Sequence, residues 1–184
     1  MVKFFKKKSG TQSQKDFLYN PVPLTWQDDY NAWDTEKKKE EYQKCQVNPI
    51  YWAKNFGVIQ HPHKGKIAFK LFPFQEIILK SFAKADNLVA NKSRQMGIST
   101  LIAGFSFWLS CFYDDKNILI IATKAEVAKN IVEKIKVFYQ YTPKWMKPRI
   151  ESWNIFSIKF SNGSTIKAST TTAAAGRSEA LSLL

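Results

Sequence analysis

The chain has 184 residues and a formal net charge of +13, from 28 Lys and Arg against 15 Asp and Glu. Hydrophobic residues make up 45% of the sequence and aromatic residues 15%, which excludes wholesale disorder and collagen-like or disulfide-scaffold classes. The length suits one domain with tails. The charge favours a polyanionic partner, and the alternative is a basic surface that only maintains solubility.

The cysteines and the apolar stretches indicate the compartment. Cys45 and Cys111 are far apart and Cys111 lies in an apolar run, so we expect two reduced thiols in an intracellular protein. The apolar stretch 101–113 is shorter than the roughly 20 residues of a membrane-spanning helix, and we expect a buried helix there. The basic N-terminus lacks the apolar core of a signal peptide. These features predict a cytoplasmic protein without a membrane partner.

The first 47 residues are predicted to lie outside the main domain. Residues 1–30 contain two prolines and no helical or strand period, which predicts a mobile basic arm and a connector. The segment 35–46 follows a possible cap, Asp34 or Thr35, and is polar nearly all round. It should form an exposed helix with a solvated Lys/Glu face. Residues 48–184 then form the domain, beginning with a short helix within 48–59.

From residue 66 onward, strand and helix patterns alternate. Strands are predicted at 67–72, 88–90, 117–123, 155–160 and 165–169, and helices at 74–84, 99–113 and 125–141. The strand 117–123 is almost wholly apolar, as expected for a strand covered on both faces. The helix 125–141 carries an apolar stripe of Val127, Ile131, Ile135 and Phe138, and Asn162-Gly163 predicts a hairpin turn. This alternation predicts an α/β sandwich around a largely parallel sheet.

The segment 87–100, NLVANKSRQMGIST, lies between a predicted strand and a helix. In a phosphate-binding loop, backbone N–H groups and the helix N-terminus cradle a polyphosphate, Ser or Thr binds magnesium, and a Lys meets the terminal phosphates. Gly97, Ser99 and Thr100 fit G-x-x-x-x-G-K-[ST]. Ile98 replaces the usual Lys, and Lys92 replaces the first Gly. The segment therefore departs from a regular Walker motif.

A nucleotide site remains possible because another cation of the loop can supply the missing charge. Lys92 and Arg94 are the candidates. The alternative is an ordinary strand–turn–helix junction in which Ser99 caps the helix.

The run KSRQMGIST resembles the deviant Walker A motif of the large terminase subunits of tailed bacteriophages, the ATPases that pump DNA into proheads. Several members carry a basic residue where Lys92 stands. Ser93, Arg94, Gln95 and Gly97 match an S-R-Q-x-G run that many members share. The resemblance covers roughly residues 48–184 and includes the strand and helix from 118 and the hairpin followed by AGRS.

The segment upstream, NPIYWAKNFGVI followed by KLFPFQ, resembles the family's adenine-binding region. Gln75 matches the glutamine that hydrogen-bonds the base, and Phe74 matches the aromatic residue before it. Without the family context, Gln75 would be interpreted as a surface residue of an amphipathic helix.

The resemblance implies a P-loop NTPase-like sheet flanked by helices, with ATP and Mg²⁺ as cofactors. Lys92 and Arg94 would be the catalytic cations, and Ser99 would hold the magnesium. ATP would be bound by Phe74, Gln75, Ser93, Gln95, Gly97, Ser99 and Thr100.

The partners that the resemblance implies are double-stranded DNA, contacted through its phosphates, the portal protein and the small terminase subunit. The location would be the cytoplasm of the infected bacterial host.

In the family, the next strand ends in the Walker B Asp and a catalytic Glu, and a nuclease domain follows. The sequence stops at Leu184, before these elements. We therefore expect an incomplete sheet and weak ATP binding without turnover. The alternative functions are half of a helicase-like ATPase and a non-catalytic basic nucleic-acid-binding fragment.

Overall fold

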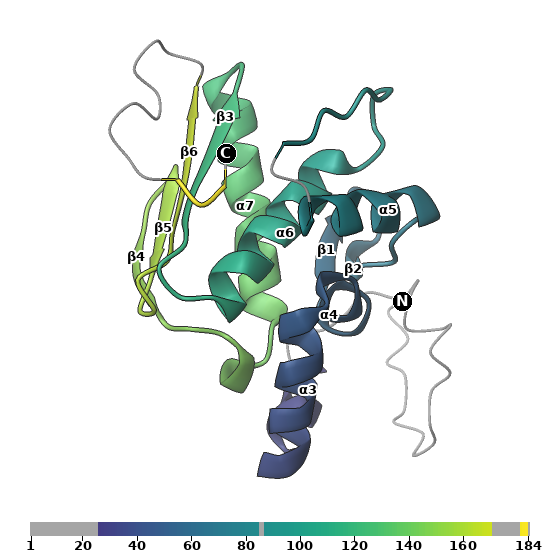
Figure 1. Cartoon of the computed structure of the whole chain (residues 1–184), viewed down its shortest axis with the longest axis vertical. Helices are drawn as coiled ribbons and strands as arrows, with labels where there is room; N and C mark the ends of the chain where they lie inside the picture. The colour runs from purple at the N-terminus through teal and green to yellow at the C-terminus, as the bar shows by residue number, and fades with distance from the viewer. Residues whose placement is uncertain (1–25, 85–86, 171–180, 184) are drawn as a thin grey trace, which may run out of the picture.

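The computed structural model describes residues 26–84, 87–170 and 181–183, in which runs of helices are followed by runs of strands (Figure 1). The helices are α2 (Trp26–Asn31), α3 (Thr35–Val47), α4 (Pro49–Phe56), α5 (Pro73–Phe82), α6 (Ile98–Phe112), α7 (Ala125–Tyr141) and the 3-10 turn η1 (Lys144–Met146). The strands are β1 (Val58–His61), β2 (Gly65–Ala68), β3 (Asn117–Ala122), β4 (Ile150–Trp153), β5 (Ser157–Phe160) and β6 (Thr165–Thr170). The fold is of the α/β class.

The main sheet has four strands in the order β3-β6-β5-β4. Strand β6 runs parallel to β3 and antiparallel to β5, and β4 is antiparallel to β5. The sheet is therefore mixed, and the prediction of a largely parallel sheet is wrong for the described strands. The reason is the predicted Asn162-Gly163 turn itself, with Gly163 at φ +80°, because a tight turn joins only antiparallel strands.

Helices α6 and α7 cover one face of this sheet. Ile118, Ile158 and Ile166 point to that face and are at most 2% exposed. On the other face, Lys167 is exposed and Ile121 is 39% exposed. On this second face, however, Leu119 is 5% exposed, so within the described residues β3 is covered along one face and partly covered on the other. The expectation of two covered faces is met in part.

The two central helices approach each other closely in an aromatic core. A Cβ atom built on Gly104 of α6 would lie 3.1 Å from Cζ of Phe138 on α7, so that the contact leaves little room for a side chain. The ring of Phe138 in turn lies 5.5 Å from that of Trp52 and 6.4 Å from that of Phe107, between ring centroids. Close packing of this kind fixes the position of α6. The first turn of this helix holds the last residues of the segment 87–100, the candidate phosphate-binding loop.

Residues 26–33 belong to the fold and not to a connector, which corrects the prediction for the end of the segment 1–30. The ring of Tyr30 lies 5.2 Å from that of Phe56, and Trp33 packs on the same ring at 6.4 Å. Trp145 Nε1 also donates to the Tyr30 carbonyl oxygen at 3.1 Å. These aromatic anchors give no periodic signal in so short a segment. The rest of the predicted arm, residues 1–25, lies outside the described residues.

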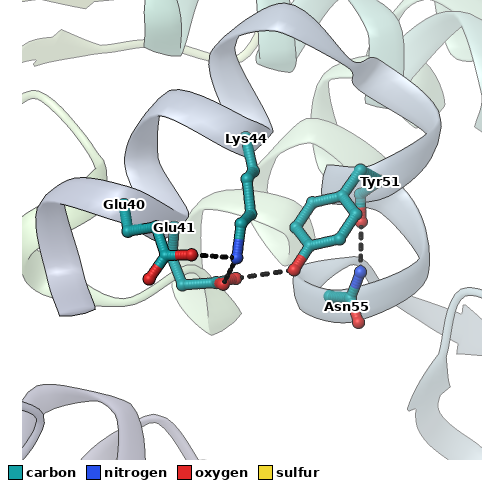
Figure 2. Close-up of polar contacts among 5 residues, drawn as sticks. All are labelled: Glu40, Glu41, Lys44, Tyr51 and Asn55. Atoms are coloured by element: carbon teal, nitrogen blue, oxygen red, sulfur yellow. Dashed lines mark hydrogen bonds and ion pairs between the residues drawn. The ribbon is translucent and has the colours of Figure 1, made fainter.

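The Lys/Glu face of α3 is partly used in holding α4 (Figure 2). Lys44 Nζ lies 2.7 Å from Glu40 and 2.9 Å from Glu41, and Tyr51 of α4 donates to the second Glu41 oxygen at 2.9 Å. Asn55 Nδ2 donates to the Tyr51 carbonyl at 2.8 Å. Burial, followed by the bond to Glu41, raises the pKa of Tyr51 to about 12. Of the other Lys and Glu residues of α3, Glu36, Lys37 and Lys39 are exposed, as predicted, and Lys38 is half-buried.

The hairpin turn is joined to the connection between α6 and β3. Asn162 Nδ2 donates to the carbonyl of Ser110 at 2.9 Å, and Ser164 Oγ donates to the carbonyl of Tyr113 at 3.0 Å. The Lys116 backbone N–H donates to Ser164 Oγ at 3.1 Å. These bonds set the start of β3 against the start of β6.

Several sequence predictions agree with the structure. The helices at 74–84, 99–113 and 125–141 are confirmed to within two residues at each end, although Val127 is 41% exposed and lies outside the buried stripe. Cys45 and Cys111 are both buried and free, and burial raises the pKa of both thiols. Among the described residues, no helix is long and apolar enough to cross a membrane.

Candidate functional site

The candidate loop leads from α5 into the first turn of α6. Two of its residues have left-handed backbone conformations, Gln95 at φ +62° and Gly97 at φ +71°. Gly97 is the N-cap residue of α6, and no side chain of the described residues caps this end of the helix. Ser99 lies inside the helix, so the alternative in which Ser99 caps it is wrong.

The first turn of α6 leaves backbone donors available. The Gly97 carbonyl accepts from the N–H groups of Thr100 and Leu101 at 3.1 and 3.0 Å. Within the described part of the chain, the N–H groups of Ile98 and Ser99 have no hydrogen-bond acceptor. Left-handed residues ahead of such a helix end can turn successive N–H groups toward one point, as anion-binding loops do.

Most of the predicted phosphate-binding side chains lie at the surface. Ser93, Arg94, Gln95 and Ser99 are exposed, as is Lys92, whose Nζ donates to the Ser93 carbonyl at 3.1 Å. The amine of Lys92 thus folds back over its own loop, and both cations face solvent.

Two further positions of the motif differ from a regular Walker loop. Ile98, at the usual position of Lys, is 6% exposed and packs into the core, so this position contributes no charge to the loop. Thr100 is half-buried and lines a separate cavity described below.

Gln75 connects α5 to the loop. It is 3% exposed, and its Nε2 donates to the Met96 carbonyl at 3.1 Å. Its Oε1 accepts from the Phe72 backbone N–H at 3.1 Å, at the start of α5. The interpretation of Gln75 as a surface residue is therefore wrong. Both ends of its amide are engaged within the protein, which makes it a positioning residue for the loop.

Two phenylalanines stack beside this connection. The rings of Phe72 and Phe74 are nearly parallel, 6° apart, with centroids separated by 5.7 Å. Phe74 is half-buried, whereas Phe72 is 60% exposed. The family resemblance indicates Phe74 only. The exposed ring is that of Phe72, and the F-P-F spacing was the signal that could have found it.

The strand predicted at 88–90 does not form. Leu88 and Val89 are 42% and 96% exposed, and this segment has no strand partner among the described residues. The free edge of β3 is instead followed in parallel by residues 181–183, with the Leu119 N–H donating to the Leu183 carbonyl at 2.9 Å. Both segments contribute to the lining of one groove of about 800 Å³, through Leu88 and Leu183. A strand as short as 88–90 is not stable unless it pairs with a neighbouring strand.

The AGRS run of the resemblance lies outside the described residues. In the described parts of the chain, no group of three or more His, Cys, Asp and Glu residues is placed to hold a metal ion. A scan against protein-family models found none that matches the chain. The structure thus brings Gln75 and the loop together, and the roles of the other site residues stay predictions.

Proposed function

We propose that the chain is part of the ATPase of a viral DNA-packaging motor, with ATP held at the loop that precedes α6. The observation that carries this proposal is the loop itself. Left-handed residues at Gln95 and Gly97 precede a helix whose first N–H groups have no acceptor among the described residues, and the Gln75 side chain bonds this loop to α5. A pre-formed set of N–H donors of this kind suits a polyphosphate.

The loop side chains fit the nucleotide and its magnesium. Lys92 and Arg94 are exposed on the loop and can offset phosphate charge in place of the buried Ile98. Ser99, exposed on the first turn, carries the hydroxyl that would hold Mg²⁺. When bound, the metal would supply positive charge that offsets the charge of the polyphosphate.

In this proposal the adenine base of ATP stacks on the exposed ring of Phe72. Gln75 is nearly fully buried and its amide is already bonded at both ends, so it is poorly disposed to bind adenine directly. Phe72 offers an open aromatic surface beside the loop, and stacking of a base on such a ring contributes about 1–3 kcal/mol.

The proposed partners follow from the charge and from the resemblance. A net charge of +13 suits contact with DNA phosphates, without regard to base sequence. The portal protein and the small terminase subunit are proposed on the resemblance alone, as is the cytoplasm of an infected bacterium. A salt titration of duplex binding tests the DNA contact. The log of the affinity should fall against the log of the salt concentration, with a slope of about −0.9 per phosphate neutralised. An affinity that is insensitive to salt would contradict it.

The nucleotide proposal is tested by titrating the purified chain with ATP and Mg²⁺ in a calorimeter. We expect Lys92→Ala and Arg94→Ala each to weaken binding about 10-fold or more, the effect of losing one charged hydrogen bond. Lys39→Ala, an exposed lysine on α3, is the charge-matched control and should change the affinity less than 2-fold. Equal effects in all three variants would show that only net charge matters, and would refute a site at the loop.

The position of the base is tested by a second pair of variants. Phe72→Ala should weaken ATP binding about 5-fold or more and leave the unfolding midpoint nearly unchanged, because its ring is largely exposed. The same loss should be absent for inorganic triphosphate, which has no base to stack. An unchanged ATP affinity in Phe72→Ala would remove this ring from the site.

A further inference from the structure

A second cavity lies between the β1–β2 hairpin and helix α7. Its volume is about 410 Å³, within the range of sites for small organic ligands. Gln60 and Lys66, which are paired across the hairpin, line one side, and Asn130 and Lys134 of α7 line the other. Among the residues predicted to bind ATP, only Thr100 reaches this cavity.

Two of the lining residues are lysines that form no ion pair within the described residues. These lysines, Lys66 and Lys134, are both half-buried. Glu133 also lines the cavity, but its carboxylate forms an ion pair with Lys136, whose Nζ lies 2.6 Å from Glu133 Oε1. Lys136 is not among the residues that line the cavity. Two ammonium groups withdrawn partly from water without a counter-ion favour an anionic ligand.

The rest of the lining is apolar. Ile59 and Pro62 of the hairpin face Val137 and Phe138 of α7. An inorganic ion would leave this apolar part of the cavity uncovered, whereas an organic phosphate would fill both parts. The Gln60 Nε2 donates to the His61 carbonyl at 3.1 Å, which leaves its amide oxygen, the amide of Asn130 and the hydroxyl of Thr100 to orient polar atoms of the ligand.

We propose that this cavity is a binding site for a phosphorylated small molecule with an apolar or planar body, such as a nucleoside monophosphate, separate from the phosphate-binding loop. The phosphate lies between Lys66 and Lys134, and the body of the ligand packs against Ile59, which is half-buried, and Pro62, which is exposed. The inference does not depend on ATP binding at the loop, because the two sites share only Thr100.

The experiment is a calorimetric titration of the full chain with AMP as the probe. Lys66→Ala and Lys134→Ala should each weaken AMP binding about 10-fold or more, as expected for the loss of a charged phosphate contact. Lys129→Ala, an exposed lysine on the same helix, is the matched control and should change the affinity less than 2-fold. Adenosine, which lacks the phosphate, should bind at least 10-fold more weakly than AMP to the wild-type chain. If Lys134→Ala does not fold, Lys134→Gln removes the charge and keeps a polar side chain at this position.

Loop variants separate this inference from the proposed function. The double variant Lys92→Ala/Arg94→Ala should leave AMP affinity unchanged within 2-fold. If the double variant abolishes AMP binding, while Lys66→Ala and Lys134→Ala leave the AMP affinity unchanged, then AMP binds at the loop. That result refutes the cavity site but leaves the proposed loop site standing. If AMP does not bind at millimolar concentration, the cavity site is also refuted.

Discussion

Replacement of Gln75 by Ala tests whether this residue positions the loop or contacts a ligand. The side chain is 3% exposed and bonds to the Phe72 N–H and the Met96 carbonyl, each at 3.1 Å. Truncation removes both bonds and leaves a cavity at the junction of α5 and the loop. The change should therefore lower stability in the absence of any nucleotide.

The magnitude follows from the two contacts. Loss of the bond to the Phe72 N–H removes a capping interaction at the start of α5, which costs about 1 kcal/mol. Loss of the bond to the Met96 carbonyl costs about 0.5–1.5 kcal/mol, and the unfilled space adds to both. We expect Gln75→Ala to lower the free energy of unfolding by about 2–3 kcal/mol.

Urea unfolding monitored by circular dichroism measures this change. Gln43→Ala, at an exposed position of α3, is the control and should stay within about 0.5 kcal/mol of the wild type. Gln75→Glu keeps an acceptor for the Phe72 N–H but faces the Met96 carbonyl with a second acceptor, so it should also destabilise at neutral pH. A Gln75→Ala variant of wild-type stability that has lost ATP binding would refute the positioning role and assign Gln75 to the ligand.

Two further predictions concern the backbone of the loop and a buried lysine. Gly97→Ala should destabilise more than Gly65→Ala, because both have positive φ but a Cβ on Gly97 would lie 2.9 Å from Gln75 Nε2, whereas a Cβ on Gly65 meets nothing within 4 Å. We expect about 1–2 kcal/mol for Gly65→Ala in urea unfolding and a larger loss for Gly97→Ala, and equal losses would contradict the close contact. Burial lowers the pKa of Lys147 to about 8 from its ordinary value of 10.5, so between these pH values the unfolded chain binds a proton that the folded chain does not. The stability of the wild type relative to Lys147→Met should therefore rise with pH across this window, by up to about 1.4 kcal/mol per pH unit, and a relative stability that falls would refute the shift.

Local patterns predicted the elements well where the signal was periodic. The helix 125–141 combines an apolar period of 3.6 with polar ends, and its observed bounds are the same. The Asn162-Gly163 hairpin was predicted from turn chemistry alone. By contrast, β4 was not predicted, because polar and apolar residues alternate only weakly over Ile150–Trp153. This segment is a strand because it pairs with β5.

The direction of the strands and the surroundings of the site residues depend on long-range contacts. Sequence alternation suggested a parallel sheet, but the turn at residue 163 imposes antiparallel pairing on β5 and β6. The side chain of Gln75 is held in the protein by its hydrogen bond to the Met96 carbonyl, 21 residues further along the chain. A local sequence pattern carries no information about a contact at this separation. The loop could be found from its residue types, whereas its attachment to α5 could not.

The bonds between the hairpin turn and the end of α6 have a consequence for the order of folding. A tight turn such as that at Asn162 can form within microseconds, because it needs only neighbouring residues. Its amide, however, donates to the Ser110 carbonyl, 52 residues earlier, and Ser164 bonds to the carbonyl of Tyr113. The acceptors exist in the required arrangement only after α6 has formed and ended. Register between the parallel strands β3 and β6 is therefore selected late, when a completed helix and a completed hairpin meet, and this docking should limit the folding rate of the sheet.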